Sequence, residues 1–284
     1  YYYVYLANRH GTPSCPIVIM NKGGQVKIQG GDLSQISLFD CSYIKVLGTG
    51  SSDTYGFRIR PYPADSLING SFAFSITGRS KNIEVSNLHI SNAGTGMNIK
   101  EDGGCDPLYN YPNWIMDSIN IHDNKIVKTW NQGMYIGNTS PDNGPASYSP
   151  RPVACNGTTF YPRPPRMGNI KVYNNFVDST GRAGIQLASA SAGISEIYNN
   201  TVKHSGMAGD DAQGAGIIVG SYTKAYIHDN TITNTYAWGL ASSGGSGTNI
   251  PLRFENNTID SSGYLNSWTL WTQGKSAIRI STEP

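Results

Sequence analysis

The stretch 172–187 reads Val-Tyr-Asn-Asn-Phe-Val-Asp-Ser-Thr-Gly-Arg-Ala-Gly-Ile-Gln-Leu, and its pattern recurs along most of the chain. A hydrophobic pair is followed by a polar pair that ends in Asn, then by hydrophobic residues and a short segment opened by Gly. The Asn that closes the polar pair recurs at intervals of 51, 25, 30 and 27 residues, at Asn124, Asn175, Asn200, Asn230 and Asn257. A repeat of roughly 20 to 50 residues is typical of a solenoid with one continuous core.

Each repeat divides into three strands: one before the polar pair, one after it, and one that follows the Gly. Alternation within these strands places Ile, Leu, Val and Met on one side, which must be the interior. The pattern therefore predicts an all-β parallel β-helix with three strands per rung and about eight rungs. The repeated Asn side chains would stack as a hydrogen-bonded ladder. Strands led by Gly are expected at 36–39, 57–60, 97–100, 134–137, 185–188, 217–220, 240–242 and 278–280.

The composition supports one elongated domain over residues 1–284. Hydrophobic residues make up 38% and charged residues only 14%, and no segment has the period and caps of a helix. Longer excursions are predicted at 61–80, 101–113, 138–168 and 261–275. Neither end supplies the cap that a solenoid requires, so we expect a segment of a longer protein with flanking domains.

Charge and cysteine content restrict partners and location. The net charge of +2, without a block of Lys and Arg, gives little support for binding nucleic acid, and no apolar run is long enough to span a membrane. The spacing of the four cysteines fits two disulfides, Cys15–Cys41 and Cys105–Cys155, although four free thiols are an alternative. Disulfides would indicate a secreted, periplasmic or cell-surface protein.

The repeated pattern of hydrophobic residue, Asn-Asn and Gly-Ile-x-Leu resembles the right-handed parallel β-helix proteins of the pectate-lyase-like superfamily. The resemblance covers roughly residues 15–280. It implies the fold, and it implies a ligand groove along the Gly-led strands and their flanking loops. Members of this superfamily include polysaccharide lyases, glycoside hydrolases, epimerases, tail proteins and adhesins.

Outward-pointing residues of the Gly-led strands are the first candidates for a binding site. Rungs repeat at about 4.8 Å, close to the length that one sugar adds to an extended glycan. Basic side chains on neighbouring rungs would bind the carboxylate or sulfate groups of an acidic polysaccharide, although a solvated sheet face is an equal alternative. The candidates are Arg58, Arg60, Asn98, Lys100, Tyr135 and Gln186.

Loops beside these strands supply the candidate chemistry. Asp210 and Asp211, with Asp102 and Asp106, could act as paired carboxylates in hydrolysis or could hold Ca²⁺, whereas turn formation is the alternative. The resemblance implies an Arg or Lys as the base of a lyase, which suggests Lys100 or Arg182. Two further candidates, Trp130 and Trp238, could stack on sugar rings or could simply cover the coil.

These features predict a secreted enzyme that acts on a polysaccharide, with β-elimination on an acidic, uronate-containing glycan favoured by the basic side chains. A glycoside hydrolase that uses the paired carboxylates is one alternative. A non-catalytic adhesin, tail-fibre segment or cell-surface spacer is the other.

Overall fold

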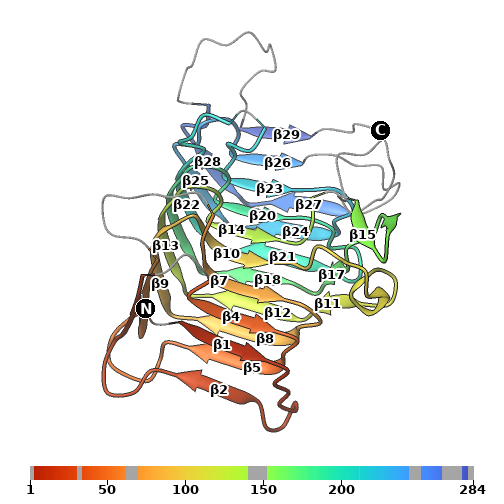
Figure 1. The fold of residues 1–284 in the computed structure, drawn as a ribbon. Helices are drawn as coiled ribbons and strands as arrows, with labels where there is room; N and C mark the ends of the chain where they lie inside the picture. Colours follow the sequence, from red (N-terminus) through yellow and green to blue (C-terminus); the bar gives the residue numbers. More distant parts are fainter. Residues whose placement is uncertain are drawn as a thin grey trace.

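The computed structural model describes residues 3–30, 34–61, 70–139, 152–210, 212–242, 251–263 and 277–280. Their strands wind around one axis and form three long parallel sheets that run the length of the coil (Figure 1). Every rung passes through the sheets in the same order, which we call A, B and C. The three-strand rung of the right-handed parallel β-helix, predicted from the repeat, is confirmed.

The strands of the three sheets are as follows. Sheet A contains β1 (Val4–Ala7), β4 (Ile36–Phe39), β7 (Phe72–Thr77), β10 (Thr95–Ile99), β14 (Met134–Ile136), β20 (Ile185–Leu187), β23 (Ile217–Val219), β26 (Leu240–Ser242) and β29 (Ile278–Ile280). Sheet B contains β2 (Ile17–Met20), β5 (Ser42–Leu47), β8 (Lys81–Ser86), β12 (Ile119–His122), β18 (Lys171–Tyr173), β21 (Ser195–Tyr198), β24 (Ala225–His228) and β27 (Leu252–Glu255). Sheet C contains β3 (Val26–Gln29), β6 (Phe57–Arg60), β9 (Leu88–Ala93), β13 (Lys125–Thr129), β19 (Phe176–Thr180), β22 (Thr201–Ser205), β25 (Thr231–Thr233) and β28 (Thr258–Asp260).

The polar pair of each repeat makes the turn between sheets B and C. Its first residue adopts a left-handed backbone, with φ between 52° and 55° at Asp123, Asn174, Asn199, Asp229 and Asn256, a conformation that Asn and Asp tolerate. The second is the ladder Asn. Side-chain amides donate to the side-chain oxygen of the next rung at 3.0, 3.0, 3.0 and 2.8 Å from Asn124 to Asn257. The predicted Asn ladder is therefore confirmed.

The Gly at the start of five strands of sheet A, β10, β14, β20, β23 and β26, has a steric role. A Cβ on Gly184 would lie 2.4 Å from Val202 Cγ1, and one on Gly133 would lie 2.6 Å from Val177 Cγ1. Three more glycines, Gly96, Gly216 and Gly239, face an Ile of sheet C at 2.7, 2.4 and 2.3 Å in the same way. Sheets C and A thus meet too closely at this corner for any side chain.

The second predicted Gly-led strand is assigned to the wrong sheet. Strand β6 belongs to sheet C, because Gly56 closes the loop between β5 and β6, and its amide donates to the carbonyl of Gly48 at 2.9 Å. A Cβ on Gly56 would lie 2.1 Å from Asn21 Oδ1, so this Gly serves a different turn. The strand of sheet A in this rung is β7, which lies inside the predicted excursion 61–80.

The excursions 101–113 and 138–168 leave the coil between sheets A and B. The segment 101–113 holds a short 3₁₀ helix, Pro107–Tyr109, and 138–168 holds a hairpin of β15 (Val153–Cys155) and β16 (Thr158–Phe160). Strand β17 (Arg166–Gly168) pairs with β11 (Ile115–Asp117), and these strands lie together at one side of the coil (Figure 1). The excursion 261–275 falls outside the described residues after position 263.

One of the two predicted disulfides is present. Cys105 and Cys155 are bonded, with Cα atoms 5.6 Å apart, and this bond links the 101–113 excursion to the β15–β16 hairpin. The predicted Cys15–Cys41 disulfide is wrong, because Cys41 is buried while Cys15 is exposed in the loop before β2. The Cys41 thiol lies 3.3 Å from the carbonyl oxygen of Phe39.

A disulfide is typical of proteins in oxidising compartments, which agrees with the predicted location outside the cytoplasm. The helix present in the described ranges has three residues, far fewer than a membrane span needs.

Candidate functional site

The outer face of sheet A brings three predicted residues together. Strand register aligns Asn98 of β10 with Tyr135 of β14, and Tyr135 with Gln186 of β20. We call Asn98, Tyr135 and Gln186 the central row. Because neighbouring strands are about 4.8 Å apart, one polar side chain lies on each of three consecutive rungs along the coil axis. Tyr135 is partly exposed, whereas Asn98 and Gln186 are 5% and 3% exposed.

The central row is held from the side by further amides. Gln132, in the turn before β14, donates to the side-chain oxygen of Gln186 at 2.9 Å and to that of Gln213 at 2.8 Å. Asn98 is only 5% exposed, and its side-chain oxygen has no hydrogen-bond partner among the described residues. A buried, unpaired acceptor costs about 1–3 kcal/mol, so this atom marks a place where a donor from a ligand or water is expected.

A cation lies beside the central row, on the side of sheet A that leads to sheet B. Lys100 follows β10, and its ammonium nitrogen lies 2.5 Å from the carboxylate of Asp102 and 5.0 Å from the ring centroid of Tyr135. Asp102 also accepts a hydrogen bond from the Asn138 side chain at 2.8 Å, and the Tyr135 hydroxyl lies 3.0 Å from Thr139 Oγ1. This network joins two successive rungs.

A second ion pair lies on the opposite side of the row, in the turns that lead from sheet C into sheet A. Arg182 Nε is 3.3 Å from the carboxylate of Asp210, and both groups are partly exposed. Trp130, one rung earlier in the equivalent turn, is 44% exposed. The two turns pack directly, because a Cβ on Gly181 would lie 1.8 Å from the Trp130 carbonyl oxygen. Asp211 lies outside the described residues.

Some predicted site residues lie elsewhere. Arg58 and Arg60 are on β6 in sheet C, so the predicted basic stripe that joins them to Lys100 on one face is wrong. The cause is the misassigned strand described above. Trp238 is only 5% exposed, and its ring packs beneath the guanidinium of Arg279 at 4.4 Å. Its indole is therefore covered, whereas that of Trp130 is open to solvent.

The residues predicted to hold Ca²⁺ do not form a cation site as placed. Asp102 is paired with Lys100, and Asp106 caps the 3₁₀ helix by accepting from the Leu108 amide at 2.9 Å. In the described part of the chain, no three acidic, His or Cys side chains converge as metal ligands would. Calcium binding stays a prediction, and we derive no chemical step through a metal.

A further carboxyl group near Lys100 carries a shifted pKa. Burial raises the pKa of Glu101, and the charges of Asp102 and Asp40 raise it further, whereas the hydrogen bond from the Gly78 amide opposes the shift. That amide lies 2.6 Å from Glu101 Oε2. Asp40 in turn accepts from the Tyr109 hydroxyl at 2.5 Å. The position of Glu101 after a Gly-led strand was visible in the sequence, but its contacts with an earlier rung were not.

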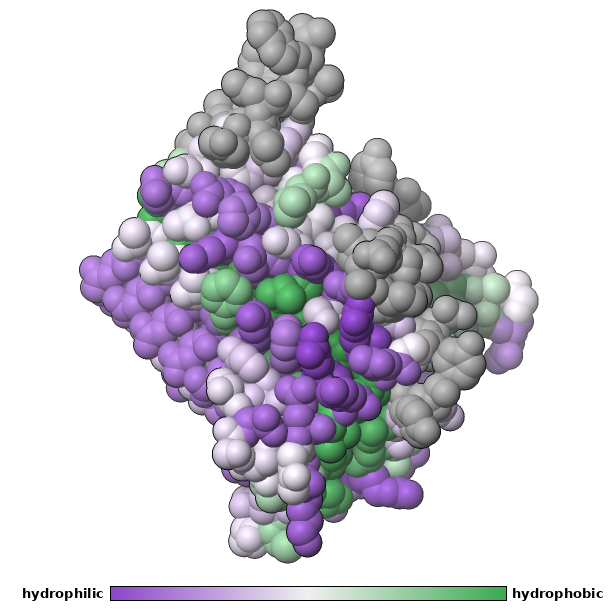
Figure 2. Space-filling view, turned by 90° about the vertical axis from the view of Figure 1, so that its left-hand side faces the viewer, coloured by the Kyte–Doolittle hydropathy of each residue, from purple (hydrophilic) through white to green (hydrophobic). Residues whose placement is uncertain are grey.

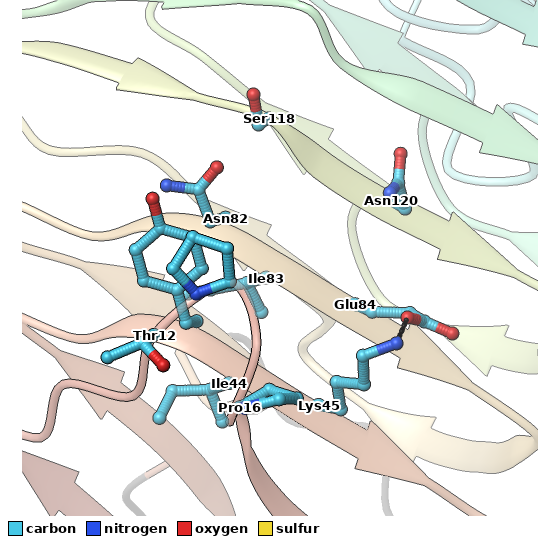
Figure 3. A pocket seen from close by; sticks show the side chains of 11 residues that line it. Thr12, Pro16, Ile44, Lys45, Asn82, Ile83, Glu84, Ser118 and Asn120 are labelled. Atoms are coloured by element: carbon cyan, nitrogen blue, oxygen red, sulfur yellow. Dashed lines mark ion pairs between the residues drawn. The ribbon is translucent and has the colours of Figure 1, made fainter.

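Two hollows lie away from the central row. One, of about 230 Å³, lies over the first rungs of sheet B, where Lys45 and Glu84 form an ion pair of 2.7 Å beside Asn82 and Asn120 (Figure 3). The other, of about 360 Å³, lies beside Trp114 and β11. Neither hollow contains a residue of the central row or its ion pairs.

No protein-family model matches the sequence, and no curated protein is a detectable sequence relative. Solved structures with a similar backbone include a GH136 lacto-N-biosidase from Eubacterium ramulus, with 12% identity and a TM-score of 0.48 over 91% of this chain. An alginate lyase from Paenibacillus sp. has 13% identity and a TM-score of 0.43, covering 89% of this chain and 86% of its own. The tailspike protein 2 enzymatically active domain of bacteriophage CBA120 has 12% identity and a TM-score of 0.45, covering 90% of this chain and 36% of its own.

This chain spans 60% of the lacto-N-biosidase. At these identities and TM-scores the likeness concerns the fold alone. The pairing of the strands shows independently that the chain is a parallel β-helix, the fold that the resemblance of its repeat implied.

Proposed function

We propose that this chain is a polysaccharide lyase that cleaves an acidic, uronate-containing glycan bound along the outer face of sheet A. The observation that carries the proposal is the central row of Asn98, Tyr135 and Gln186. The row runs between two ion pairs, Lys100–Asp102 and Arg182–Asp210. A row of polar groups on consecutive rungs suits an extended chain of sugars, and the exposed ring of Trp130 supplies a stacking surface beside it.

The reaction requires three actions from the protein. The uronate carboxylate is neutralised, a base removes the proton at C5, and the C4–O bond breaks as the C4–C5 double bond forms and the leaving oxygen takes up a proton. Lys100 is suited to the first action, and the side-chain amide of Asn98 can add a hydrogen bond to the same carboxylate. Stabilisation of the negative charge that develops next to the carboxylate is the main source of rate in such a scheme.

Tyr135 is the residue in this proposal that transfers the proton. It lies at the centre of the row, with its ring centroid 5.0 Å from the ammonium of Lys100 and its hydroxyl 3.0 Å from Thr139 Oγ1. Lys100 and Arg182, expected above as bases, each contact a carboxylate. Because the Asp102 side chain is 69% exposed, Lys100 can exchange this partner for a uronate carboxylate.

A glycoside hydrolase is the second candidate, and one observation favours it. Hydrolysis needs a carboxyl group that remains protonated, and burial raises the pKa of Glu101 in that direction. However, the two carboxylates that flank the central row, Asp102 and Asp210, are both engaged in ion pairs. This arrangement favours elimination. The Cys105–Cys155 disulfide supports an extracytoplasmic location for either enzyme.

The test compares three variants on the uronate polysaccharide that gives the highest rate. Tyr135→Phe keeps the ring beneath Lys100 and removes only the hydroxyl, so kcat should fall by about 10²–10⁴-fold. Lys100→Met should raise KM and lower kcat together, because it removes a positive charge that contacts the uronate carboxylate in both the enzyme–substrate complex and the transition state. Tyr198→Phe, in the stacked aromatic side chains of sheet B, is the matched control and should leave both constants unchanged.

The reaction product distinguishes a polysaccharide lyase from a glycoside hydrolase. Elimination leaves an unsaturated uronate that absorbs near 235 nm, whereas hydrolysis releases reducing ends without that absorbance. If neither appears on any glycan, the catalytic proposal fails and a binding or structural coil is favoured. If activity appears but Tyr135→Phe retains it, the lyase proposal stands and the role of Tyr135 is wrong.

A further inference from the structure

Sheet C carries a row of basic side chains that does not belong to the central row of sheet A. Strand register aligns Lys27 of β3 with Arg58 of β6, Arg58 with His89 of β9, and His89 with Lys125 of β13. We call these four residues the basic row. Neighbouring strands are about 4.8 Å apart, so the row extends for roughly 14 Å along the coil axis. Arg60 lies on the same outer face of β6, two residues further on.

The charges of the basic row are not balanced within the described structure. None of Lys27, Arg58 and Lys125 forms an ion pair there, and the four strands that carry the row contain no Asp or Glu. Sheet B is built differently. Two of its cations face carboxylates on the next rung, in Lys45–Glu84 at 2.7 Å and Lys171–Glu196 at 2.9 Å. The repeat therefore accommodates cross-rung pairs, and sheet C lacks them at this place.

Two further observations show that the row is electrostatically unsatisfied. Arg58 Nε is buried and has no hydrogen-bond partner in the described part of the chain. The pKa of His89 is lowered by burial first, and then by the positive charges of Lys125 and Arg58. Like charges placed directly opposite each other on neighbouring strands are destabilising. A bound polyanion would offset this repulsion.

We propose that the basic row is a second binding surface for an acidic polysaccharide, distinct from the site on sheet A and without a catalytic role. The side of the coil that carries sheet C is largely hydrophilic (Figure 2), as such a surface requires. The proposal rests on the proposed function only for the class of ligand, because its geometry is independent of sheet A. The basic row would hold a long polysaccharide on the enzyme while the central row acts on another segment of the same polysaccharide.

The spacing and the boundary of the row argue for a glycan. One cation or His per rung matches one acidic sugar per step of an extended polysaccharide, which gives three to four sugars along the row. The row ends at Phe176, which follows Lys125 in the register and lies 5.7 Å from its ammonium. Beyond it the register continues with Thr201, Thr231 and Thr258, which are uncharged.

The experiment measures binding of immobilised polygalacturonate, alginate and heparin by interferometry at two salt concentrations. The test variant combines Lys27→Gln, Arg58→Gln and Lys125→Gln. Three partly exposed charge contacts, each contributing up to about fivefold, predict a loss of affinity of roughly tenfold to a hundredfold. The salt dependence should weaken as well, because fewer counterions are released.

The matched control removes the same charge from sheet B by combining Lys45→Gln, Lys171→Gln and Arg253→Gln, all of which have carboxylate partners. It should bind within about threefold of the unmodified chain. Both triple variants should melt as cooperatively as the unmodified chain. Cleavage of a short uronate oligosaccharide, followed at 235 nm, should be unchanged in the test variant, since that substrate needs only the central row.

Several outcomes overturn the proposal. Equal loss in both triple variants would show that only net charge matters, and absence of binding to all three glycans would remove the surface altogether. Tighter binding of a single-stranded oligonucleotide than of any glycan would contradict the ligand class. Glycan binding that depends on the basic row, in a chain that cleaves nothing, would support this proposal while refuting the lyase.

Discussion

The interior of the Asn ladder should be the most sensitive polar position in the coil, and Asn200→Ala tests it. The side-chain nitrogen of Asn200 donates to the carbonyl oxygens of Val172 and Tyr198 at 2.9 and 3.0 Å and to the side-chain oxygen of Asn230 at 3.0 Å. Its side-chain oxygen accepts from the backbone and side-chain nitrogens of Asn175, both at 3.0 Å. Alanine removes all five contacts.

The expected loss of stability follows from which groups are left without partners. The backbone N–H of Asn175 is buried and loses its acceptor, which costs about 1–3 kcal/mol. The side chain of Asn175 keeps bonds to the carbonyls of Ile121 and Tyr173, and Asn230 keeps the backbone donor of residue 200. The remaining lost bonds contribute about 0.5–1.5 kcal/mol each. We therefore expect a decrease of at least about 3 kcal/mol in the free energy of unfolding.

Urea denaturation followed by circular dichroism measures this change, with Asn257→Ala as the control. Asn257 ends the ladder in the described structure, and its side chain is only partly buried, so water can replace its bonds. Its substitution should cost about 1–2 kcal/mol. If Asn200→Ala lowers stability by less than about 1 kcal/mol, or by no more than Asn257→Ala does, the ladder does not hold the rungs together as described.

Three further predictions concern the corner, the thiols and the basic row. Gly184→Ala should lower the free energy of unfolding by about 1–3 kcal/mol because the new methyl group meets sheet C, whereas Gly104→Ala, with open space around it, should leave it nearly unchanged. Thermal melting compares the two variants, and equal effects would contradict the close approach of sheets C and A at this corner. Thiol titration should find one reactive thiol in the folded chain, Cys15, and two after unfolding, because Cys41 is buried and burial raises its pKa. Reduction of the unfolded chain should raise the number of thiols to four, whereas a folded and an unfolded chain without any reactive thiol before reduction would indicate a Cys15–Cys41 disulfide. Burial and the cations of the basic row lower the pKa of His89, so its imidazole binds a proton less readily in the folded chain than in the unfolded chain. The stability of the chain should therefore fall as the pH drops below about 6.5, and His89→Gln should reduce the difference between the melting temperatures at pH 7 and pH 5. An equal difference in the two proteins would refute the lowered pKa.

The coil was predictable because its determinants are local and repeated. Each copy carries the left-handed residue and the ladder Asn side by side, as at Asn199 and Asn200, and the alternation that fills the core follows directly. The Gly at the start of β10, β14, β20, β23 and β26 also repeats. The register between copies then follows from stacking equivalent residues, which is why Asn98, Tyr135 and Gln186 could be expected on neighbouring rungs.

Two sequence-based predictions, the face that carries Arg58 and Arg60 and the Cys15–Cys41 disulfide, were wrong because the same residue type can serve different purposes in the fold. Gly56 looked like the opening of another strand of sheet A, but it closes a turn against Gly48, and this moved Arg58 and Arg60 to the wrong face. The spacing of Cys15 and Cys41 matched one repeat, but spacing does not show which way a thiol points.

Contacts between side chains from distant turns had no sequence signal at all. The amide cluster around Gln132 joins residues that are 54 and 81 positions apart. The ion pairs of Lys100 and Arg182 likewise depend on how their loops fold back over the sheet.

The most direct test of the account is the absorbance at 235 nm of the purified chain mixed with a panel of uronate-containing polysaccharides. The account predicts a rise on at least one of them, and loss of that rise when the Tyr135 hydroxyl is removed. A flat trace on every uronate polysaccharide, from a chain that is folded by circular dichroism, would contradict the assignment of lyase chemistry to the outer face of sheet A.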